Sequence, residues 1–392
     1  MRPTHRALRV CYVITEFDAG GAERIVLQTV QRHDRKAFRS YIVSLRARGS
    51  LSPEAERSGV EVIHLGMGRR PGPGTIWRLA RLFRDRNVDI AHAYLYDASI
   101  ATRIAGRLAR VPVVVTSTRA SLSYLPRLAW WLDRATARWC QRIIAVSRGT
   151  AEFVVEREGI PRDKVVVIPN GVDLERFRPG DRVRARTHLG VSVDAFVLAC
   201  VGRLHPQKGH RYLFEAIAAV HGRTREFICL IAGDGPLRRA LEAEARRLGL
   251  GMVCRFLGVQ DPIQPLYNAA DVTVLASLYE GMPNVVLEAM AMGCPVIATA
   301  VEGSVELVQT GVTGLLVPPA DAHALGLALL ELAGDPQRRS AMGRAARAVA
   351  ERLHGIDRMV AALEAFYATE WDLSTGTDGW LREVPDQPRS RR

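Results

Sequence analysis

Short apolar runs alternate with amphipathic stretches along most of the chain, a pattern typical of strands and helices that follow one another in turn. In the first half, the apolar runs predict strands at Val10–Ile14, Tyr41–Leu45, Val60–Leu65, Ile90–Ala93, Val111–Thr116, Ile143–Val146 and Val165–Ile168. Helical periodicity lies between most of them, at Ala22–Val30, Ile76–Arg86, Ala98–Ala109 and Tyr124–Arg138. Strands that alternate with helices predict an α/β fold with a doubly wound parallel sheet.

A second alternating series follows the turn-rich segment Asn170–Pro179. Its predicted strands are Phe196–Val201, Phe227–Ala232, Val253–Leu257, Val272–Leu275, Val296–Ala298 and Gly314–Val317, and a helical region closes it from Ala322 to Tyr367. We therefore predict two Rossmann-like domains, residues 1–178 and 179–365, and a tail, residues 366–392, that packs back on the first domain. Ligands bind beyond the carboxyl ends of such strands, so we expect the site in a cleft between two facing domains.

The composition indicates a soluble globular protein, with 48% hydrophobic and 24% charged residues. No apolar run reaches the roughly 18 residues that would predict a membrane span. The basic and then apolar start of the chain lacks a small-residue cleavage site, so it predicts a first strand rather than a signal peptide. The six cysteines, none of them in a C-x-x-C pair, lie mostly in apolar runs and predict buried reduced thiols in a cytosolic protein.

The positive charge is concentrated in the first half of the chain. Residues 1–180 carry 31 Lys and Arg against 17 Asp and Glu, a net charge of +14, whereas residues 181–392 have a net charge of −1. This asymmetry predicts an anionic partner, such as a phospholipid surface or a lipid phosphate. A general bias toward arginine, with 51 Arg and 3 Lys, would also explain it. No nucleic-acid-binding motif is present, so we do not expect nucleic acid as a partner.

One aromatic and basic stretch, residues 124–142, is a candidate membrane-facing helix. Trp130, Trp131 and Trp139 lie there among four arginines at helical spacing, as in helices that bind a membrane interface. Tryptophans packed in the core and arginines in solvent are an equally good interpretation. We expect a cytoplasmic protein, with peripheral attachment at the inner face of the membrane as the alternative to a freely soluble one.

The stretch Ala276–Gly293 carries two glutamates around the start of a predicted helix. Glu280 lies in the loop after a buried strand, and Glu288 lies about one turn inside the helix, with Asn284 as the candidate N-cap. The backbone amides of residues 284–286 would lie between the carboxylates. A helix N-terminus binds anions and carboxylates bind hydroxyl groups, so a ligand with phosphate and sugar hydroxyls fits. Two solvated glutamates are the alternative.

Two further loops carry groups suited to phosphate. Arg203 and Lys208 follow the first strand of the second series, where a guanidinium and an ammonium can both bind phosphate oxygens. The chain uses one of its three lysines here, which favours a site over a solvated loop. Gly20 and Gly21 follow the first strand and expose backbone at a helix start, although adjacent glycines are often only a turn.

These segments resemble the retaining glycosyltransferases of family 4, which have the GT-B fold. The run EGMPNVVLE matches the family's E-x7-E motif, and GRLHPQKG matches its GR-x-x-x-x-KG segment. The resemblance implies that Arg203 and Lys208 bind the donor diphosphate, that Glu280 binds the donor sugar and that Glu288 binds the nucleotide ribose. It further implies donor-binding roles for Gly20, Gly21, Gly258, Val259, Met282, Pro283, Asn284, Val285 and Val286.

The sequence departs from the family pattern in two places. Many relatives carry a histidine near the transferred sugar, where this chain has Thr116–Arg119. Arg119 and His92 are therefore the candidate acceptor-side residues, and a structural role for His92 is an equal alternative. The frequent Gly-Gly before a late glutamate is replaced here by Val301–Glu306, which reads VEGSVE.

The sequence thus predicts an enzyme that transfers a sugar from a nucleotide diphosphate sugar to a lipid-linked or saccharide acceptor in envelope polysaccharide or glycolipid synthesis. We expect retention of configuration, no metal and no cofactor other than the donor substrate, since the cations of the site can stabilise the leaving diphosphate. A sugar-nucleotide epimerase on the same fold and a non-catalytic nucleotide-sugar-binding protein are the alternatives.

Overall fold

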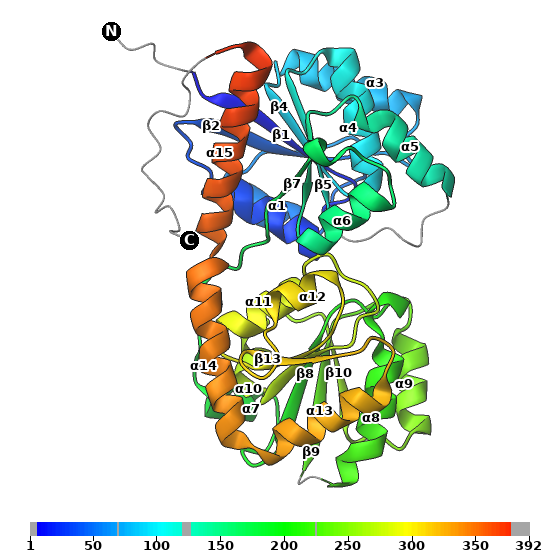
Figure 1. The fold of residues 1–392 in the computed structure, drawn as a ribbon, viewed down its shortest axis with the longest axis vertical. Coiled ribbons are helices and arrows are strands. Elements are labelled where there is room, and N and C mark those ends of the chain that lie inside the picture. Colours follow the sequence, from blue (N-terminus) through cyan, green and yellow to red (C-terminus); the bar gives the residue numbers. More distant parts are fainter. Residues whose placement is uncertain (1–5, 69, 120–126, 224–225, 378–392) are drawn as a thin grey trace. The chain divides into compact units, whose positions relative to one another are not determined.

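The computed structural model of the protein describes residues 6–68, 70–119, 127–223 and 226–377. They form two compact α/β units (Figure 1). Unit 1 contains the residues up to 146, residues 150–169 and the residues from 356 onward, and unit 2 contains residues 147–149 and 170–355. The expected division between residues 178 and 179 lies within unit 2, and the chain returns to unit 1 at residue 356, before the expected start of a tail at residue 366.

Unit 1 is built on a seven-stranded sheet with the strand order β3-β2-β1-β4-β5-β6-β7. Its strands are β1 Leu8–Ile14, β2 Phe38–Ser44, β3 Val62–His64, β4 Ile90–Tyr94, β5 Val113–Thr118, β6 Arg142–Ala145 and β7 Val165–Val167. Its helices are α1 Gly21–Arg32, α2 Ser52–Arg57, α3 Pro73–Asp85, α4 Tyr96–Ala109, α5 Arg127–Ala137, α6 Arg148–Glu156 and α15 Ile356–Thr375. All neighbouring strands pair in parallel, which confirms the predicted doubly wound sheet.

Unit 2 has a six-stranded parallel sheet with the order β10-β9-β8-β11-β12-β13. Its strands are β8 Phe196–Val201, β9 Phe227–Ala232, β10 Cys254–Gly258, β11 Val272–Leu275, β12 Val296–Thr299 and β13 Gly314–Val317. Its helices are α7 Arg182–His188, α8 His210–Val220, α9 Arg238–Arg247, α10 Gln264–Ala269, α11 Asn284–Ala291, α12 Glu302–Leu307, α13 Ala322–Gly334 and α14 Pro336–Leu353. Single 3-10 turns lie at Arg162–Lys164, Pro206–Lys208 and His221–Arg223.

Two predicted segments extend beyond the described residues. The helix expected from Tyr124 begins outside them, and α5 is described from Arg127 onward. The loosely ordered tail expected from Ser374 also lies mostly outside them, and its first two residues complete α15.

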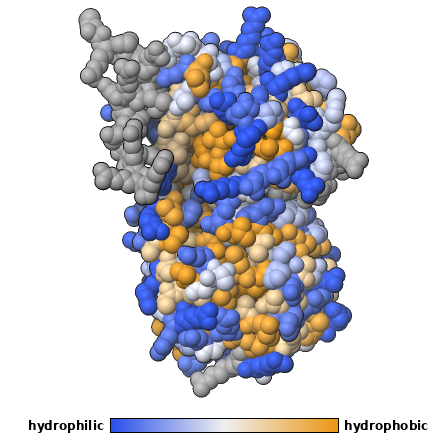
Figure 2. All heavy atoms as spheres, viewed as in Figure 1, coloured by the Kyte–Doolittle hydropathy of each residue, from blue (hydrophilic) through white to orange (hydrophobic). Residues whose placement is uncertain are grey.

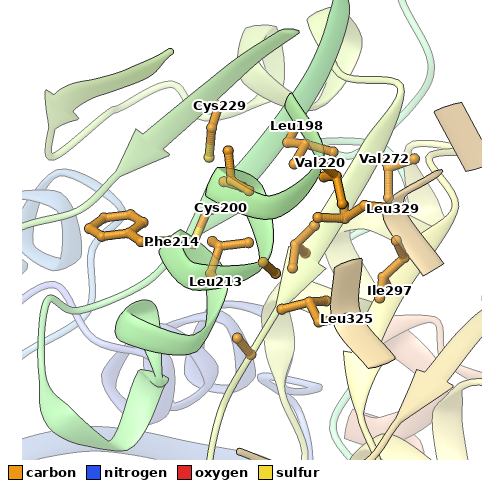
Figure 3. Close-up of a cluster of buried hydrophobic side chains, with 14 of the residues drawn as sticks. Leu198, Cys200, Leu213, Phe214, Val220, Cys229, Val272, Ile297, Leu325 and Leu329 are labelled. Atoms are coloured by element: carbon orange, nitrogen blue, oxygen red, sulfur yellow. The ribbon is translucent and has the colours of Figure 1, made fainter. Parts of the chain in front are cut away.

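Each sheet buries apolar side chains on both faces, as expected for parallel strands covered by helices. In unit 1, Val10 and Tyr12 of β1 face α1 and α15, whereas Cys11 and Val13 face α3 and α4. In unit 2, the core drawn in Figure 3 joins β8, β9 and β11 to α8 and α13. All six cysteines are buried and free, as predicted. Hydrophobic residues also reach the surface of each unit among hydrophilic ones (Figure 2).

A buried ion pair fixes the two central strands of unit 2 at their amino ends. Asp271, directly before β11, accepts a hydrogen bond from the Val197 amide of β8 at 2.9 Å. Its carboxylate also meets the buried guanidinium of Arg186 at 2.8 Å. Arg186 in turn donates to the carbonyls of Ala269, Ser192, Val193 and Ala195, so its remaining donors are satisfied. This network sets the register of the strand pair that carries the candidate site.

We predict that Arg186→Met lowers the free energy of unfolding by about 1–3 kcal/mol, because four carbonyls lose their donor while Asp271 keeps its pairs with Arg182 at 2.6 Å and Arg339 at 3.4 Å. Arg184→Met, on the exposed side of the same helix, is the control and should change it by no more than about 0.5 kcal/mol. Urea unfolding of both variants measures the difference, and equal losses would contradict the structural role of the pair.

Candidate active site

The strand order of unit 2 reverses between β8 and β11. These strands are neighbours, but the chain runs from β8 to β9 on one side and from β11 to β12 on the other. The loops that follow β8 and β11 therefore leave the sheet in opposite directions, which opens a crevice at the carboxyl edge where ligands of such sheets bind. Arg203 and Lys208 lie on the first loop and Glu280 lies on the second. Two of the segments predicted from sequence thus meet at one switch point.

Backbone contacts hold the two loops together. The Leu278 amide donates to the Gln207 carbonyl at 2.7 Å, and the Gln207 side chain donates to the Tyr279 carbonyl at 2.9 Å. Gly209 ends the first loop with a φ of 61°, and a Cβ atom at this position would lie 2.1 Å from the Ala276 carbonyl oxygen. Only glycine allows both this conformation and this approach.

Lys208 and Glu280 form an ion pair across the two loops. The Lys208 Nζ donates to Glu280 Oε1, and the Ser277 hydroxyl donates to the same oxygen at 2.7 Å. The Ser277 carbonyl is held in turn by the Thr299 hydroxyl at 2.5 Å. Glu280 is 8% exposed. The carboxylate is therefore fixed by two donors, while the ammonium lies at the crevice.

Arg203 lies on the same loop as Lys208 but does not share its contacts. Its side chain is exposed and makes no hydrogen bond or ion pair with any residue that the structure describes. Its carbonyl accepts from the His205 amide at 2.9 Å, which shapes the turn. The structure thus brings Lys208 and Glu280 together and leaves the Arg203 guanidinium available at the surface.

The start of α11 differs from the prediction in its cap. The N-cap is Pro283, and Asn284 is the first helical residue. The Asn284 side chain instead accepts from the Asn170 amide group at 2.8 Å. The Val286 amide donates to the Pro283 carbonyl at 3.1 Å and is engaged in the first turn. The Val285 amide makes no hydrogen bond within the described part of the chain, so it is the amide left for a ligand.

Asn170 holds this helix start in place, a role that the sequence did not reveal. Its backbone amide contacts the Met282 sulfur at 3.2 Å, and its side chain donates to the Met282 carbonyl at 3.2 Å. Met282 and Pro283 are both buried. The Asn-Gly pair at residues 170–171 predicts only a turn, because nothing local indicates that its partner lies 112 residues further along.

Glu288, inside α11, is oriented by Tyr267 of α10. The Tyr267 hydroxyl donates to Glu288 Oε2 at 2.7 Å. Burial raises the pKa of Tyr267 well above its usual value, and the Glu288 carboxylate raises it further, so the hydroxyl remains a donor. The carboxylate is half-buried and has a defined orientation.

Gly258 and Val259 lie at the carboxyl end of β10, two strands away from β8. Gly258 has a φ of 70°, and its carbonyl accepts from the Gly233 amide at 2.7 Å. A Cβ atom on Gly233 would lie 1.9 Å from the Gly202 carbonyl oxygen, so the loops after β8, β9 and β10 lie against one another. Val259 is 68% exposed. The backbone of these loops thus forms one side of the switch point.

Glu302 is a second residue that the sequence analysis did not select. It replaces the frequent glycine noted above and begins α12. Its Oε2 lies 3.3 Å from the Glu280 amide, which donates to it, and a Cβ on Gly303 would lie 2.0 Å from the Gly281 carbonyl oxygen. The departure from the family pattern was the available signal, and it places a further carboxylate beside the Glu280 loop.

In unit 1, the strand order reverses between β1 and β4. Gly20 is the N-cap of α1 and Gly21 its first residue, so both lie at the helix start, one position before the predicted first residue Ala22. The Glu23 carboxylate folds over Gly20, where a Cβ would lie 2.2 Å from Glu23 Oε2. Arg119, after β5, places its Cζ 5.4 Å from the centre of the Tyr94 ring. Burial lowers the pKa of Arg119, while Tyr94 and Glu23 act in the opposite direction.

His92 is buried in β4 with both ring nitrogens occupied. Its Nδ1 lies 2.5 Å from the Tyr367 hydroxyl and its Nε2 lies 2.7 Å from the Ser117 hydroxyl. The side chain is 0% exposed. This favours the structural alternative for His92 over direct contact with an acceptor.

The described residues contain no group of three or more His, Cys, Asp or Glu side chains placed to hold a metal ion. Within the same residues, no helix combines the length and the apolar character that crossing a bilayer requires.

Two family models match the chain in sequence order. Residues 19–176 match the model described as Glycosyltransferase Family 4. Residues 195–335 match the model described as Glycosyl transferases group 1. The matches fall on the two α/β units and include all the candidate site residues.

Curated relatives cover most of the chain. The D-inositol 3-phosphate glycosyltransferase of Actinosynnema mirum is 32% identical over 91% of this chain and 94% of its own length. The UDP-Gal:alpha-D-GlcNAc-diphosphoundecaprenol alpha-1,3-galactosyltransferase of Escherichia coli is 28% identical over 86% of this chain and 90% of its own.

Solved structures share the fold at lower identity. HepE of Anabaena, in complex with UDP and glucose, superposes with a TM-score of 0.84 at 22% identity, covering 92% of this chain and 100% of that one. The lipopolysaccharide glycosyltransferase WaaG superposes with a TM-score of 0.75 at 18% identity, covering 94% and 100%. The predicted GT-B fold is thereby confirmed.

We predict that Gly209→Ala separates the two loops and destabilises the protein more than a left-handed alanine alone, which costs about 1–2 kcal/mol. Gly190→Ala is the matched control, since Gly190 has the same φ of 61° and open space around it. Urea unfolding of both variants isolates the clash with Ala276. Equal destabilisation would show that the close approach of the loops is not required.

Proposed function

Because this chain belongs to the family 4, group 1 glycosyltransferases, we propose that it transfers a sugar from a nucleotide diphosphate sugar to an acceptor hydroxyl with retention of configuration. The Lys208–Glu280 contact at the strand-order switch point carries this proposal, since it joins a phosphate-binding cation to a hydroxyl-binding carboxylate.

Lys208 would stabilise the charge that develops on the departing diphosphate, the largest change of charge in the reaction. Its ammonium is paired with Glu280 before the donor binds, which keeps it pointing into the crevice at no further ordering cost. Arg203, exposed and without an ion pair in the described structure, would add a bidentate contact to the same phosphates. The Val285 amide at the start of α11 would supply a further donor.

Glu288 and Glu280 would bind hydroxyl groups at the two ends of the donor. Glu288, oriented by Tyr267, would accept from the nucleotide ribose. Glu280 would accept from the donor sugar through the oxygen that Lys208 and Ser277 leave open, and so position the ring. Gly258 and Val259 would line the nucleotide through their backbone.

The same contacts support transfer from the front face of the sugar. A carboxylate whose oxygen already accepts from an ammonium and a hydroxyl is a weak nucleophile, so Glu280 is unsuited to form a covalent intermediate. The leaving phosphate would then help to deprotonate the acceptor on the face from which it departs. Since Lys208 and Arg203 supply the positive charge, we propose that transfer needs no metal ion.

We propose a phosphate-bearing acceptor, either lipid-linked or a small saccharide-like alcohol, as in envelope polysaccharide or glycolipid synthesis. The printed names of two relatives support this class, because inositol 3-phosphate and a GlcNAc-diphosphoundecaprenol both carry phosphate. Arg119 is the cation in unit 1 that such a group would meet.

The donor test is release of nucleoside diphosphate from a panel of nucleotide sugars in the presence of a chelator. We expect turnover that Lys208→Met lowers by about 10²–10³-fold, the usual effect of losing one donor to a developing anion. Lys36→Met, at an exposed lysine of unit 1, is the control and should leave turnover unchanged.

Loss of all activity with the chelator would overturn the metal-independent mechanism. A product of inverted configuration by NMR would overturn retention. Conversion of the donor to its epimer without nucleotide release would indicate the epimerase instead, and binding without turnover would indicate a non-catalytic protein.

We further propose that unit 1 attaches to an anionic membrane surface through α5. Leu128, Trp131 and Leu132 are 67%, 64% and 39% exposed on this helix. An open cavity of about 540 Å³ lies beside its carboxyl end, lined by Arg107, Arg110, Arg138, Lys164 and uncharged residues, without a carboxylate. Apolar side chains near cations that form no ion pair with the described residues favour the headgroup region of an anionic bilayer.

The membrane proposal is tested by co-sedimentation with vesicles that contain phosphatidylglycerol. We expect Trp131→Ser combined with Arg138→Gln to weaken binding at least fivefold, since each cation near the surface contributes about 1 kcal/mol. Trp77→Ser combined with Arg78→Gln removes the same residue types from α3 and is the control. Absence of wild-type binding at low salt would remove the proposal.

A further inference from the structure

The last helix that the structure describes, α15, buries one tyrosine at the switch point of unit 1. Tyr367 of α15 is 0% exposed. Its hydroxyl donates to the Tyr12 hydroxyl of β1 at 3.0 Å and lies 2.5 Å from His92 Nδ1 of β4. It therefore joins the two strands between which the order of the sheet reverses, from a position 275 residues away in the sequence.

The hydrogen bonds continue on both sides of Tyr367. The Tyr12 hydroxyl lies 2.8 Å from His33 Nε2, and His33 Nδ1 lies 3.3 Å from the Ser40 hydroxyl. On the other side, His92 Nε2 lies 2.7 Å from the Ser117 hydroxyl of β5. Six side chains thus form one line through the core, and Ser117 at its end also hydrogen-bonds the Tyr94 side chain. We call these residues, Ser40, His33, Tyr12, Tyr367, His92 and Ser117, the buried line.

The number of protons available determines which group donates in the hydrogen bonds made by His92. Burial lowers the pKa of His33 to about 4 and the pKa of His92 well below its usual value, so both rings are neutral, with one donor and one acceptor nitrogen each. Because Tyr367 uses its one proton toward Tyr12, the two links on the His92 side can run in only one direction. With Tyr367 donating to Tyr12, His92 Nδ1–H donates to Tyr367 and Ser117 donates to His92 Nε2. The Tyr367 hydroxyl connects the Ser40–His33–Tyr12 part of the buried line to the His92–Ser117 part.

The His92 ring contacts Tyr94, which in turn contacts the candidate acceptor-side residue Arg119. Its ring centre lies 4.5 Å from that of Tyr94, with the planes inclined by 38°. The Arg119 guanidinium lies over the Tyr94 ring. Ser117, at the end of the line, lies two residues before Arg119 on β5 and its following turn. The Tyr94 ring that lies under the Arg119 guanidinium thus contacts a histidine that is closed off from solvent.

We propose that Tyr367 is a positioning residue for the acceptor side of the enzyme: it holds the His92 ring, which supports Tyr94 and through it Arg119. This rests on the proposed function, since it takes Arg119 to face the acceptor. It also assigns the C-terminal helix a part in transfer beyond covering the core of unit 1.

The hydroxyl can be removed without undocking the helix. Glu370 of α15 forms an ion pair with Arg142 at 3.1 Å, Asp357 forms one with Arg32 at 3.3 Å, and Glu364 accepts from the Asp34 amide at 2.8 Å. The aromatic ring of Tyr367 also packs against Phe38 and His33. Tyr367→Phe keeps all of these contacts and deletes only the hydroxyl, with its links to Tyr12 and His92.

The test compares steady-state kinetics of Tyr367→Phe with Tyr41→Phe, which removes a buried hydroxyl of β2 outside the line. We expect Tyr367→Phe to lower kcat/KM for the acceptor about tenfold, a usual effect of leaving one buried polar group unpaired, and to leave the donor KM unchanged. Tyr41→Phe should change neither. Equal loss for donor and acceptor, or loss of thermal stability with unchanged kinetics, would overturn the proposal.

A second variant reaches His92 from the other side. Ser117→Ala should reproduce the acceptor defect, and the double variant should be no worse than either single one, because both substitutions release the same His92 ring. Multiplicative effects would contradict a single line.

A readout that does not need turnover separates this proposal from the proposed function. In ¹⁵N NMR spectra, His92 should be one fixed neutral tautomer in the wild type and in Tyr41→Phe, and should lose that preference in Tyr367→Phe. Unchanged His92 signals would overturn the inference even if transfer is observed. If they change but no transfer occurs, the positioning of His92 stands and the acceptor role fails with the proposed function.

Discussion

The account depends on the reversal of strand order between β8 and β11. Where the strand order of a parallel sheet reverses, the two βα loops leave the sheet in opposite directions. A crevice therefore opens between these loops at the carboxyl edge of the sheet. The Lys208–Glu280 ion pair occupies that space and is the one charged contact between the loops in the part of the chain that the structure describes. Burial of Asp271 with Arg186 at the opposite end of the strands keeps this geometry in register.

Glycine makes the crevice possible because the neighbouring loops approach more closely than a side chain allows. Gly209 lies against Ala276 and Gly303 against Gly281, so the loops after β8, β11 and β12 form one rigid edge. A rigid edge with a fixed ammonium suits electrostatic catalysis, since the charge needs no reorganisation when the diphosphate leaves. In unit 1 the corresponding reversal is held by hydrogen bonds among buried neutral groups, so the two units support their edges by different means.

The fold could be predicted from the sequence because apolar period and turn residues are local properties. Every predicted strand is present within a few residues, and the loops with Arg203, Lys208 and Glu280 follow the strands expected. Contacts between distant segments could not be predicted in this way. Asn170, Glu302 and Tyr367 contact partners in other segments of the chain. The predicted N-cap of α11 was wrong because the Asn284 side chain binds Asn170 rather than an amide of its own helix.

The central claim is that Lys208 and the start of α11 bind one diphosphate. A crystal structure of the protein with the nucleoside diphosphate that best raises its melting temperature tests this most directly. The account predicts phosphate oxygens within hydrogen-bonding distance of both the Lys208 Nζ and the Val285 amide, with the Arg203 guanidinium turned toward them. A diphosphate bound elsewhere on unit 2, with the Lys208–Glu280 pair unchanged and the Val285 amide solvated, would contradict it.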